Sequence, residues 1–245
     1  MKKKKNVAVI PARGGSQAIP KKNIKLFEGK PLIAWTIECA LAVKGIDRVI
    51  VSTDSQEIAD ISLQYGAEVP FLRPTEISTS QTPIEPVMAH AYEWLIKNEH
   101  YRPESVILLF TTCPIRETRH IEEALALFYD SGADSVISVN ESPAHYTPYW
   151  TLVRNREGSV SYFNGQDIRR GYSRRQDFPQ TCFAKNDLVF VIKPQNLFED
   201  PPSLFGKKVE LYVTGRIYDA DINTPEDWEL TLMTYRYLKS KDKNP

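Results

Sequence analysis

The chain has 245 residues, and its 31 Lys and Arg residues are balanced by 31 Asp and Glu residues. A chain of this size can bury a substantial core, and a net charge of zero provides no basic field for nonspecific nucleic-acid binding. No stretch approaches the roughly 20 apolar residues of a membrane span, and the N-terminus lacks the apolar segment of a secretory signal. We therefore expect a cytoplasmic protein without nucleic-acid or membrane partners.

Apolar runs alternate with helical patterns through the first 140 residues. Short apolar runs that lead into loops indicate strands buried on both faces, and apolar residues at i, i+3, i+4 and i+7 indicate amphipathic helices. Strands are predicted at residues 7–10, 49–53, 68–72, 106–110 and 135–139, and helices at residues 31–43, 54–66, 83–98 and 121–128. This order predicts the α/β class, with a mostly parallel sheet, helices on both faces and right-handed crossovers.

The alternation stops after residue 139. Residues 142–180 are rich in Pro, Gly, Tyr and Arg, and we interpret them as an excursion from a single domain that spans residues 1–245. Its aromatic residues, which we expect to be exposed, suit a dimerisation arm or a substrate lid; they are Tyr149, Trp150, Tyr162 and Phe163. Strands follow at 188–192 and 209–213, and Thr224 and Pro225 predict the start of a terminal helix.

The loop after the first strand reads "ARGGSQAIPKKN". Gly14 and Gly15 let backbone N–H groups approach an anion, Arg13 can bind phosphate oxygens in a bidentate manner, and Lys21 or Lys22 adds a point charge. The loop is neither a Walker A sequence nor GxGxxG, so a plain glycine-containing turn remains the alternative.

Two carboxylates, Asp219 and Asp221, stand one residue apart before the terminal helix. On an extended chain such a pair points to the same side, which suits joint binding of Mg²⁺ by hard oxygens. Asp also caps helices and stabilises turns, so the pair alone is weak evidence of a metal site. A GT-A glycosyltransferase also uses a DxD, but there it follows a mid-sheet strand.

Four arginines lie within "RRGYSRRQ", residues 169–176 of the excursion. The run is either a solvated basic face or a site that recognises an acidic substrate or a phosphate, including one from across a dimer. The cysteines are odd in number and lack CxxC spacing, so they predict neither a disulfide framework nor a zinc site, and nothing near Cys113 indicates an activated nucleophile; they are Cys39, Cys113 and Cys182.

Together these motifs resemble the cytidylyltransferases that make CMP-sialic acid and related CMP-nonulosonates. The resemblance rests on these blocks, which occur in order between residues 7 and 228: "VAVIPARGGS", "IPKKNIK", "GKPLIAWTI", "RVIVSTDSQEIA", "FLRPTEIS", "LLFTTCPIR", "SRRQDFPQ" and "YDADINTPEDW". It implies a Rossmann-like nucleotidyltransferase that transfers CMP from CTP to the anomeric hydroxyl of a nine-carbon α-keto acid sugar and releases pyrophosphate. It also implies Mg²⁺ as cofactor and a homodimer.

The resemblance further implies roles for individual residues. The nucleotide would be bound by Ala12, Arg13, Gly14, Ser16, Lys22, Asn23 and Arg73, and the acceptor sugar by Phe110, Arg175, Gln176, Asn186 and Phe190. Asp219 and Asp221 would bind Mg²⁺, and with Arg13 and Lys22 they would form the catalytic set.

Three departures from the family pattern fall at strand-end loops. Ser16-Gln17-Ala18 stands where Ser-Lys-Gly is usual, Phe110 replaces a Gln, and Ala184-Lys185-Asn186-Asp187 replaces Arg-Pro-Asn-Gly. We interpret them as signs of a shifted acceptor, either a deoxy or diamino nonulosonate or a different acidic acceptor such as a phosphonate. The loss of a loop lysine also leaves open a catalytically weakened nucleotide-binding paralogue.

Overall fold

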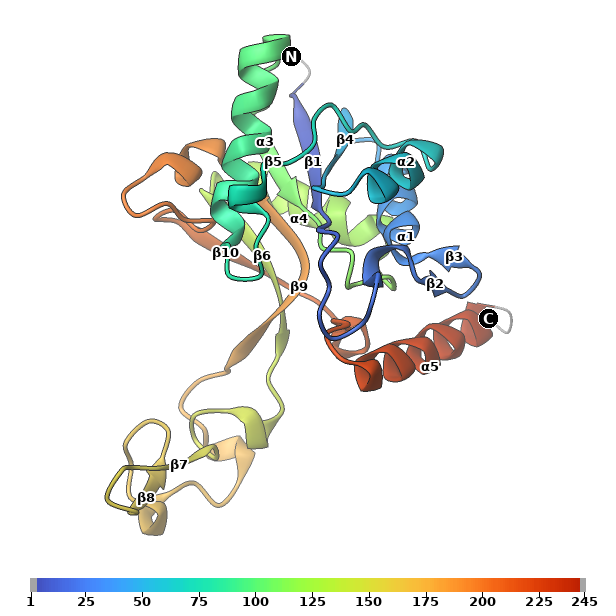
Figure 1. Cartoon of the computed structure of the whole chain (residues 1–245). Helices are drawn as coiled ribbons and strands as arrows, with labels where there is room; N and C mark the ends of the chain where they lie inside the picture. The colour runs from blue at the N-terminus through green and yellow to red at the C-terminus, as the bar shows by residue number, and fades with distance from the viewer. Residues whose placement is uncertain (1–3, 243–245) are drawn as a thin grey trace.

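The computed structural model describes residues 4–242, so both ends of the predicted 1–245 domain lie outside the described residues. A six-stranded sheet has the order β10-β6-β9-β5-β1-β4 (Figure 1). Its strands are β1 (Asn6–Pro11), β4 (Arg48–Ser52), β5 (Ser105–Leu108), β6 (Ser135–Glu141), β9 (Phe183–Ile192) and β10 (Val209–Val213). Only β9 runs antiparallel to its neighbours in this sheet; the other pairs are parallel. The predicted mostly parallel α/β sheet is confirmed.

Helices cover both faces of the sheet. Alternate β1 side chains point to opposite sides, so each face presents apolar residues against which helices pack. Ala8 and Ile10 belong to one core cluster, with apolar residues of α1 and α4, whereas Val7 and Val9 pack with α3 in another. The helices are α1 (Leu32–Leu41), α2 (Gln56–Gln64), α3 (Ile84–Glu99), α4 (Thr118–Ser131) and α5 (Pro225–Asp242). Short 3₁₀ helices occupy Lys22–Ile24, Thr75–Ile77, Ala144–Tyr146, Ile168–Arg170, Arg175–Asp177, Pro194–Phe198 and Arg216–Tyr218.

A third, smaller core brings the terminal helix to the start of the chain. Trp228 of α5 and Ile222 pack with Phe27 of the hairpin β2 (Leu26–Phe27) and β3 (Lys30–Pro31), and with Ile19 of the loop after β1. The predicted start of the terminal helix is confirmed, because Thr224 Oγ1 accepts from the Asp227 N–H at 3.2 Å. Ser55 caps α2, since its Oγ accepts from the Ile58 N–H at 3.4 Å. This cluster places the segment before α5 beside the β1 loop.

The predicted strand at residues 68–72 is wrong. Only two isolated bridges occur there, Ile50 with Glu68 and Thr53 with Leu72, both parallel to the edge of the sheet. Pro70 lies between them, and proline has no N–H to donate to a ladder. The segment therefore follows β4 without completing a seventh strand.

Residues 142–180 form an arm that extends away from the sheet (Figure 1), and its root is the last part of the β6–β9 ladder, where Glu141 pairs with Phe183. The arm contains the antiparallel hairpin β7 (Leu152–Arg154) and β8 (Val160–Tyr162). Of the four arm aromatics expected to be exposed, only Phe163 is, at 65%. Trp150 and Tyr162 are half-buried, and Tyr149 is buried because its ring packs against Tyr172 and Phe178. None of the helices among the described residues has the length and apolar content needed to cross a membrane.

Candidate functional site

The loop after β1 is closed by backbone contacts with the loop after β4. The Ala12 N–H donates to the Ser52 carbonyl at 2.9 Å, and the Gly14 N–H donates to Asp54 Oδ1 at 2.8 Å. A Cβ on Gly14 would lie 3.1 Å from the Cβ of Ser55, so this close approach favours glycine. Gly15 has open space around its Cα and is free to face a ligand.

Asn23 connects this loop to the loop after β5. Its Nδ2 donates to the Arg13 carbonyl at 2.9 Å, and its Oδ1 accepts from Thr111 Oγ1 at 2.7 Å. Because both ends of the amide are used and the residue is buried, Asn23 fixes the loops in place. Ser16 remains half-buried, and its N–H donates to the Gly14 carbonyl at 3.1 Å.

Lys22 connects the β1 loop to the segment that carries the carboxylate pair, 200 residues further along the chain. Its Nζ donates to the Ile222 carbonyl at 2.7 Å, and the Ile222 N–H donates to the Thr112 carbonyl at 3.0 Å. Burial lowers the pKa of Lys22, and the charge of Arg13 lowers it further, whereas Asp221 raises it. The neighbouring Lys21 instead pairs with Glu57 of α2 at 2.7 Å, so the two lysines diverge.

The predicted metal pair lies directly after the 3₁₀ turn Arg216–Tyr218. Burial raises the pKa of Asp219, the nearby charge of Arg216 opposes this, and Asp221 adds to it. Asp221 Oδ2 accepts from Asn223 Nδ2 at 2.6 Å, which leaves its other oxygen available. Among residues 4–242 no set of three His, Cys, Asp or Glu side chains could hold a metal. The pair fits Mg²⁺, which commonly takes one or two carboxylates and completes its shell with water and substrate phosphate oxygens.

A cavity of about 260 Å³ adjoins the β1 loop. Arg13, Arg73 and Phe110 line it, with Thr79, Ser80 and Thr82 among the polar residues on its rim. Arg73 is only 5% exposed; its Nε donates to Ser78 Oγ at 3.0 Å, and its Nη2 lies 3.9 Å from Asp54 Oδ1. Burial lowers the pKa of Arg73, Asp54 opposes this, and Arg13 adds to it. Two guanidinium groups and one aromatic ring thus border a small cavity.

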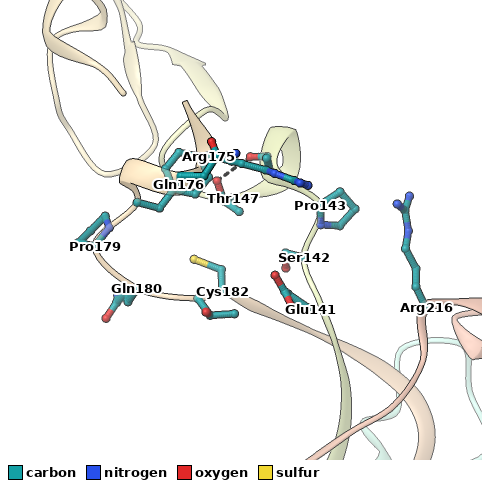
Figure 2. A pocket seen from close by; sticks show the side chains of 13 residues that line it. Glu141, Ser142, Pro143, Thr147, Arg175, Gln176, Pro179, Gln180, Cys182 and Arg216 are labelled. Carbon is teal, nitrogen blue, oxygen red and sulfur yellow. Dashed lines mark hydrogen bonds between the residues drawn. The ribbon is translucent and has the colours of Figure 1, made fainter. Parts of the chain in front are cut away.

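A larger cavity of about 680 Å³ lies where the arm joins the sheet (Figure 2). Arg175 and Gln176 line it from the arm, Glu141 and Ser142 line it from the end of β6, and Arg216 stands at its side. The predicted acceptor-binding residues are therefore divided, because Phe110 lines the smaller cavity instead.

Two predicted acceptor-binding residues lie inside the protein. Asn186 is 2% exposed and donates from Nδ2 to Thr214 Oγ1 at 2.7 Å. Phe190 is 1% exposed, and its ring packs edge-on against Phe110 with centroids 6.2 Å apart. Neither side chain has the exposed surface needed to contact a ligand directly. Phe190 instead supports Phe110, which lines the smaller cavity.

The sequence analysis placed neither Asp54 nor Arg116 in the functional site. Asp54 accepts from Gly14 and lies near Arg73, and its place in the loop after β4 could have identified it. Arg116 is buried without a carboxylate partner: it donates to the carbonyls of Leu188 and Phe110, at 2.5 and 2.8 Å, and to Thr36 Oγ1 at 3.1 Å. No local sequence signal distinguishes such a buried arginine from a ligand-binding one.

Cys113 lies in the β5 loop and is fully buried. Burial raises the pKa of its thiol to about 12, and Sγ lies 3.5 Å from the Asp187 carbonyl. The thiol therefore stays protonated at neutral pH, as expected for a residue that is not a nucleophile.

A mostly parallel α/β sheet whose carboxyl edge carries a basic, glycine-containing loop and a carboxylate pair fits the nucleotidyltransferase class. The chain belongs to the cytidylyltransferase family, whose model matches residues 7–205. This confirms the resemblance found in the sequence motifs and the enzyme class that it implies.

Similar proteins cover nearly the whole chain. It is 33% identical over 230 residues to CMP-N,N'-diacetyllegionaminic acid synthase of Legionella pneumophila, across 92% of this chain and 94% of that protein. It is 30% identical over 232 residues to pseudaminic acid cytidylyltransferase of Campylobacter jejuni, across 95% and 97%. A solved structure of CMP:2-keto-3-deoxy-manno-octonic acid synthetase complexed with CTP matches with a TM-score of 0.68 and 19% identity, across 95% of this chain and 99% of that one, which shows a shared fold.

Proposed function

We propose that the protein transfers CMP from CTP to the anomeric hydroxyl of a sialic-acid-like nonulosonic acid and releases pyrophosphate, with Mg²⁺ as cofactor. Two relatives that match along nearly their whole length are named for legionaminic and pseudaminic acid. The observation that carries the proposal is the Lys22–Ile222 hydrogen bond, which joins the β1 loop to the carboxylate pair. A triphosphate bound by the loop would thereby lie beside the metal ligands.

The charges around this point suit phosphoryl transfer. Negative charge develops on the departing pyrophosphate, and Arg13 and Lys22 would stabilise it together with the N–H groups of the glycine loop. Asp219 and Asp221 would hold Mg²⁺, which would supply further charge neutralisation on the phosphates. The cavity lined by Arg73 and Phe110 would receive the nucleotide base, since the rest of its wall is formed by short polar and apolar side chains.

The cavity at the root of the arm would receive the acceptor. Arg175 and Arg216 line it, and a guanidinium group binds a carboxylate through two parallel hydrogen bonds. Arg216 also stands three residues before Asp219 in the sequence, which would bring this cavity and the proposed metal site within reach of one substrate. An acidic sugar held there would have its reacting hydroxyl near the α-phosphate.

Incubation of the protein with CTP, Mg²⁺ and a panel of nonulosonic acids tests the proposal by measuring pyrophosphate and the CMP-conjugate formed. We expect equimolar release of both products with CTP, and little with ATP, GTP or UTP. Asp221→Asn serves as the matched control, because it retains the side-chain shape and removes the charge needed to bind Mg²⁺. Release only with a phosphonate or another acidic acceptor would contradict the proposal.

A further inference from the structure

Strand β9 contains a large bulge at the carboxyl edge of the sheet. Ile137 of β6 pairs with Phe190, and Val139 pairs with Lys185. The four β9 residues 186–189 therefore oppose the single residue Ser138. Since β5 ends at Leu108, opposite Phe190, residues 186–188 lie past that end, next to the β5 loop. Bulges of this kind re-aim side chains and are common beside active sites.

The bulge is held by side chains from several surrounding elements. Arg116 Nε donates to the Leu188 carbonyl at 2.5 Å, and Ser138 Oγ accepts from the Val189 N–H at 2.9 Å. Asn186 of the bulge is itself fixed to Thr214. These contacts are buried, so the backbone on both sides of residue 187 is constrained.

Asp187 occupies the constrained position with unusual geometry. Its φ is 54°, in the left-handed region that favours glycine, and its side chain is 27% exposed. The carboxylate atom Oδ1 is buried without a hydrogen-bond partner, although Lys185 Nζ lies 3.3 Å away as an ion pair. A residue held at positive φ by its surroundings, with a buried carboxylate oxygen beside the Lys185 ammonium, indicates a functional role at this edge of the sheet.

The chemistry around Asp187 restricts what it can bind. A carboxylate only accepts hydrogen bonds, and it repels phosphate and carboxylate groups. Burial raises the pKa of Asp187, the charge of Lys185 opposes this, and the charge of Asp221 adds to it. The Lys185 ammonium already balances the charge of the carboxylate, which disfavours a second cation beside it. The ligand class that fits is therefore a neutral donor on the substrate, namely a hydroxyl or an acylamino N–H.

We propose that Asp187 is a specificity-determining residue that accepts a hydrogen bond from a hydroxyl or acylamino group of the acceptor. The inference rests on the proposed function. The phosphates of CTP belong to the β1 loop and the carboxylate pair, so Asp187 contacts the sugar and leaves binding of the nucleotide unchanged.

Steady-state kinetics of Asp187→Asn and Asp187→Gly test this, with CTP and the acceptor varied separately. We expect Asp187→Gly to raise the acceptor KM about tenfold, the effect of a lost hydrogen bond to a charged group, and Asp187→Asn, which keeps a neutral acceptor oxygen, to raise it less. Both variants should change the CTP KM less than about twofold. The loss should disappear for an acceptor analogue in which the recognised hydroxyl or acylamino group is replaced by hydrogen. Asp187→Gly should melt at or above the wild-type temperature, because glycine accepts positive φ without strain.

His100→Gly is the matched control, because His100 also has positive φ (52°) but ends α3. It should leave both KM values unchanged. Unchanged acceptor KM in both Asp187 variants, or a change confined to the CTP KM and the half-saturating Mg²⁺ concentration, would overturn the inference. A wild-type protein that releases no pyrophosphate with any nonulosonic acid would instead overturn the proposed function, and is recognised before any variant is compared.

Discussion

Gln17 and Ala18 are exposed in the β1 loop, where the family pattern has lysine and glycine. The loop keeps its other contacts, so the missing lysine removes charge without changing the fold. We predict that Gln17→Lys lowers the CTP KM about two- to fivefold, the range of a surface charge interaction, and leaves the melting temperature unchanged. Steady-state kinetics with varied CTP measure this.

Gln64→Lys is the control for Gln17→Lys, because it adds the same charge at an exposed position at the end of α2. Equal effects of the two substitutions would show that general charge, and not the loop position, affects nucleotide binding. A strong rise in kcat with Gln17→Lys would support the weakened-paralogue alternative.

His120 makes stability depend on pH. It is 1% exposed, and burial lowers its pKa to about 4 from 6.5. The folded state therefore binds fewer protons than the unfolded state between pH 6.5 and 4, so stability is complete above 6.5 and falls as pH decreases through this window. We predict that His120 alone lowers the free energy of unfolding by about 2 kcal/mol between pH 7 and pH 5.

Urea unfolding of the wild type and of His120→Gln at both pH values measures this contribution. The variant should lose about 2 kcal/mol less than the wild type over the same interval, whatever its stability at pH 7. If the free energy of unfolding decreases equally in both proteins between pH 7 and pH 5, groups other than His120 cause the pH dependence.

At the scale of elements, the segment before α5 is fastened to the start of α4. Tyr218 Oη donates to Glu117 Oε1 at 2.7 Å, and the Tyr218 ring packs against His120. Tyr218 immediately precedes Asp219, so this link orients the carboxylate pair. We predict that Tyr218→Phe raises the Mg²⁺ concentration for half-maximal activity about fivefold, consistent with one lost hydrogen bond of about 1 kcal/mol.

Tyr212→Phe is the matched control for Tyr218→Phe. Tyr212 Oη donates to Glu123 and thereby makes the same kind of link between β10 and α4, but it does not adjoin the carboxylate pair. Calorimetric titration with CTP present should show weaker Mg²⁺ binding for Tyr218→Phe and unchanged Mg²⁺ binding for Tyr212→Phe. Equal weakening in both variants would show that general loosening of α4 is responsible.

Whether a segment forms a helix or a strand could be predicted from the sequence where the periodic pattern of apolar residues was long and uninterrupted. The period identified the parallel strands and their helices, and the rule that sites follow strand ends directed attention to the loop that contains Arg13 and Lys22. The DxD pattern, and not a strand end, nominated Asp219 as a metal ligand. The β9 bulge could not be predicted, because it depends on buried contacts from Arg116 and Ser138, which lie far away in sequence. For the same reason Asn186 and Phe190 were expected at the ligand surface but lie in the interior.

At the scale of the whole molecule, the proposed nucleotide and acceptor sites lie on different parts of the fold. The cavity lined by Arg73 is built on loops of the sheet. The cavity lined by Arg175 lies at the root of the arm (Figure 2). The arm has its own aromatic cluster, in which Trp150 Nε1 donates to the Tyr172 carbonyl at 2.6 Å. It is therefore a preformed unit joined to the sheet through β6 and β9.

Such an arm leaves apolar side chains uncovered at its end. Phe163 is 65% exposed and Leu152 of β7 is 55% exposed, and exposed apolar residues that gather on one projection favour an interface. We predict that the arm packs against a second copy of the chain, and that Phe163→Asp shifts the protein from dimer to monomer in light scattering. Leu230→Asp on α5, where Leu230 is 63% exposed, is the matched control and should remain dimeric. A wild-type protein that is monomeric at the concentration of the activity assay would contradict the predicted homodimer. If both variants are monomeric, the dimer interface is not confined to the arm.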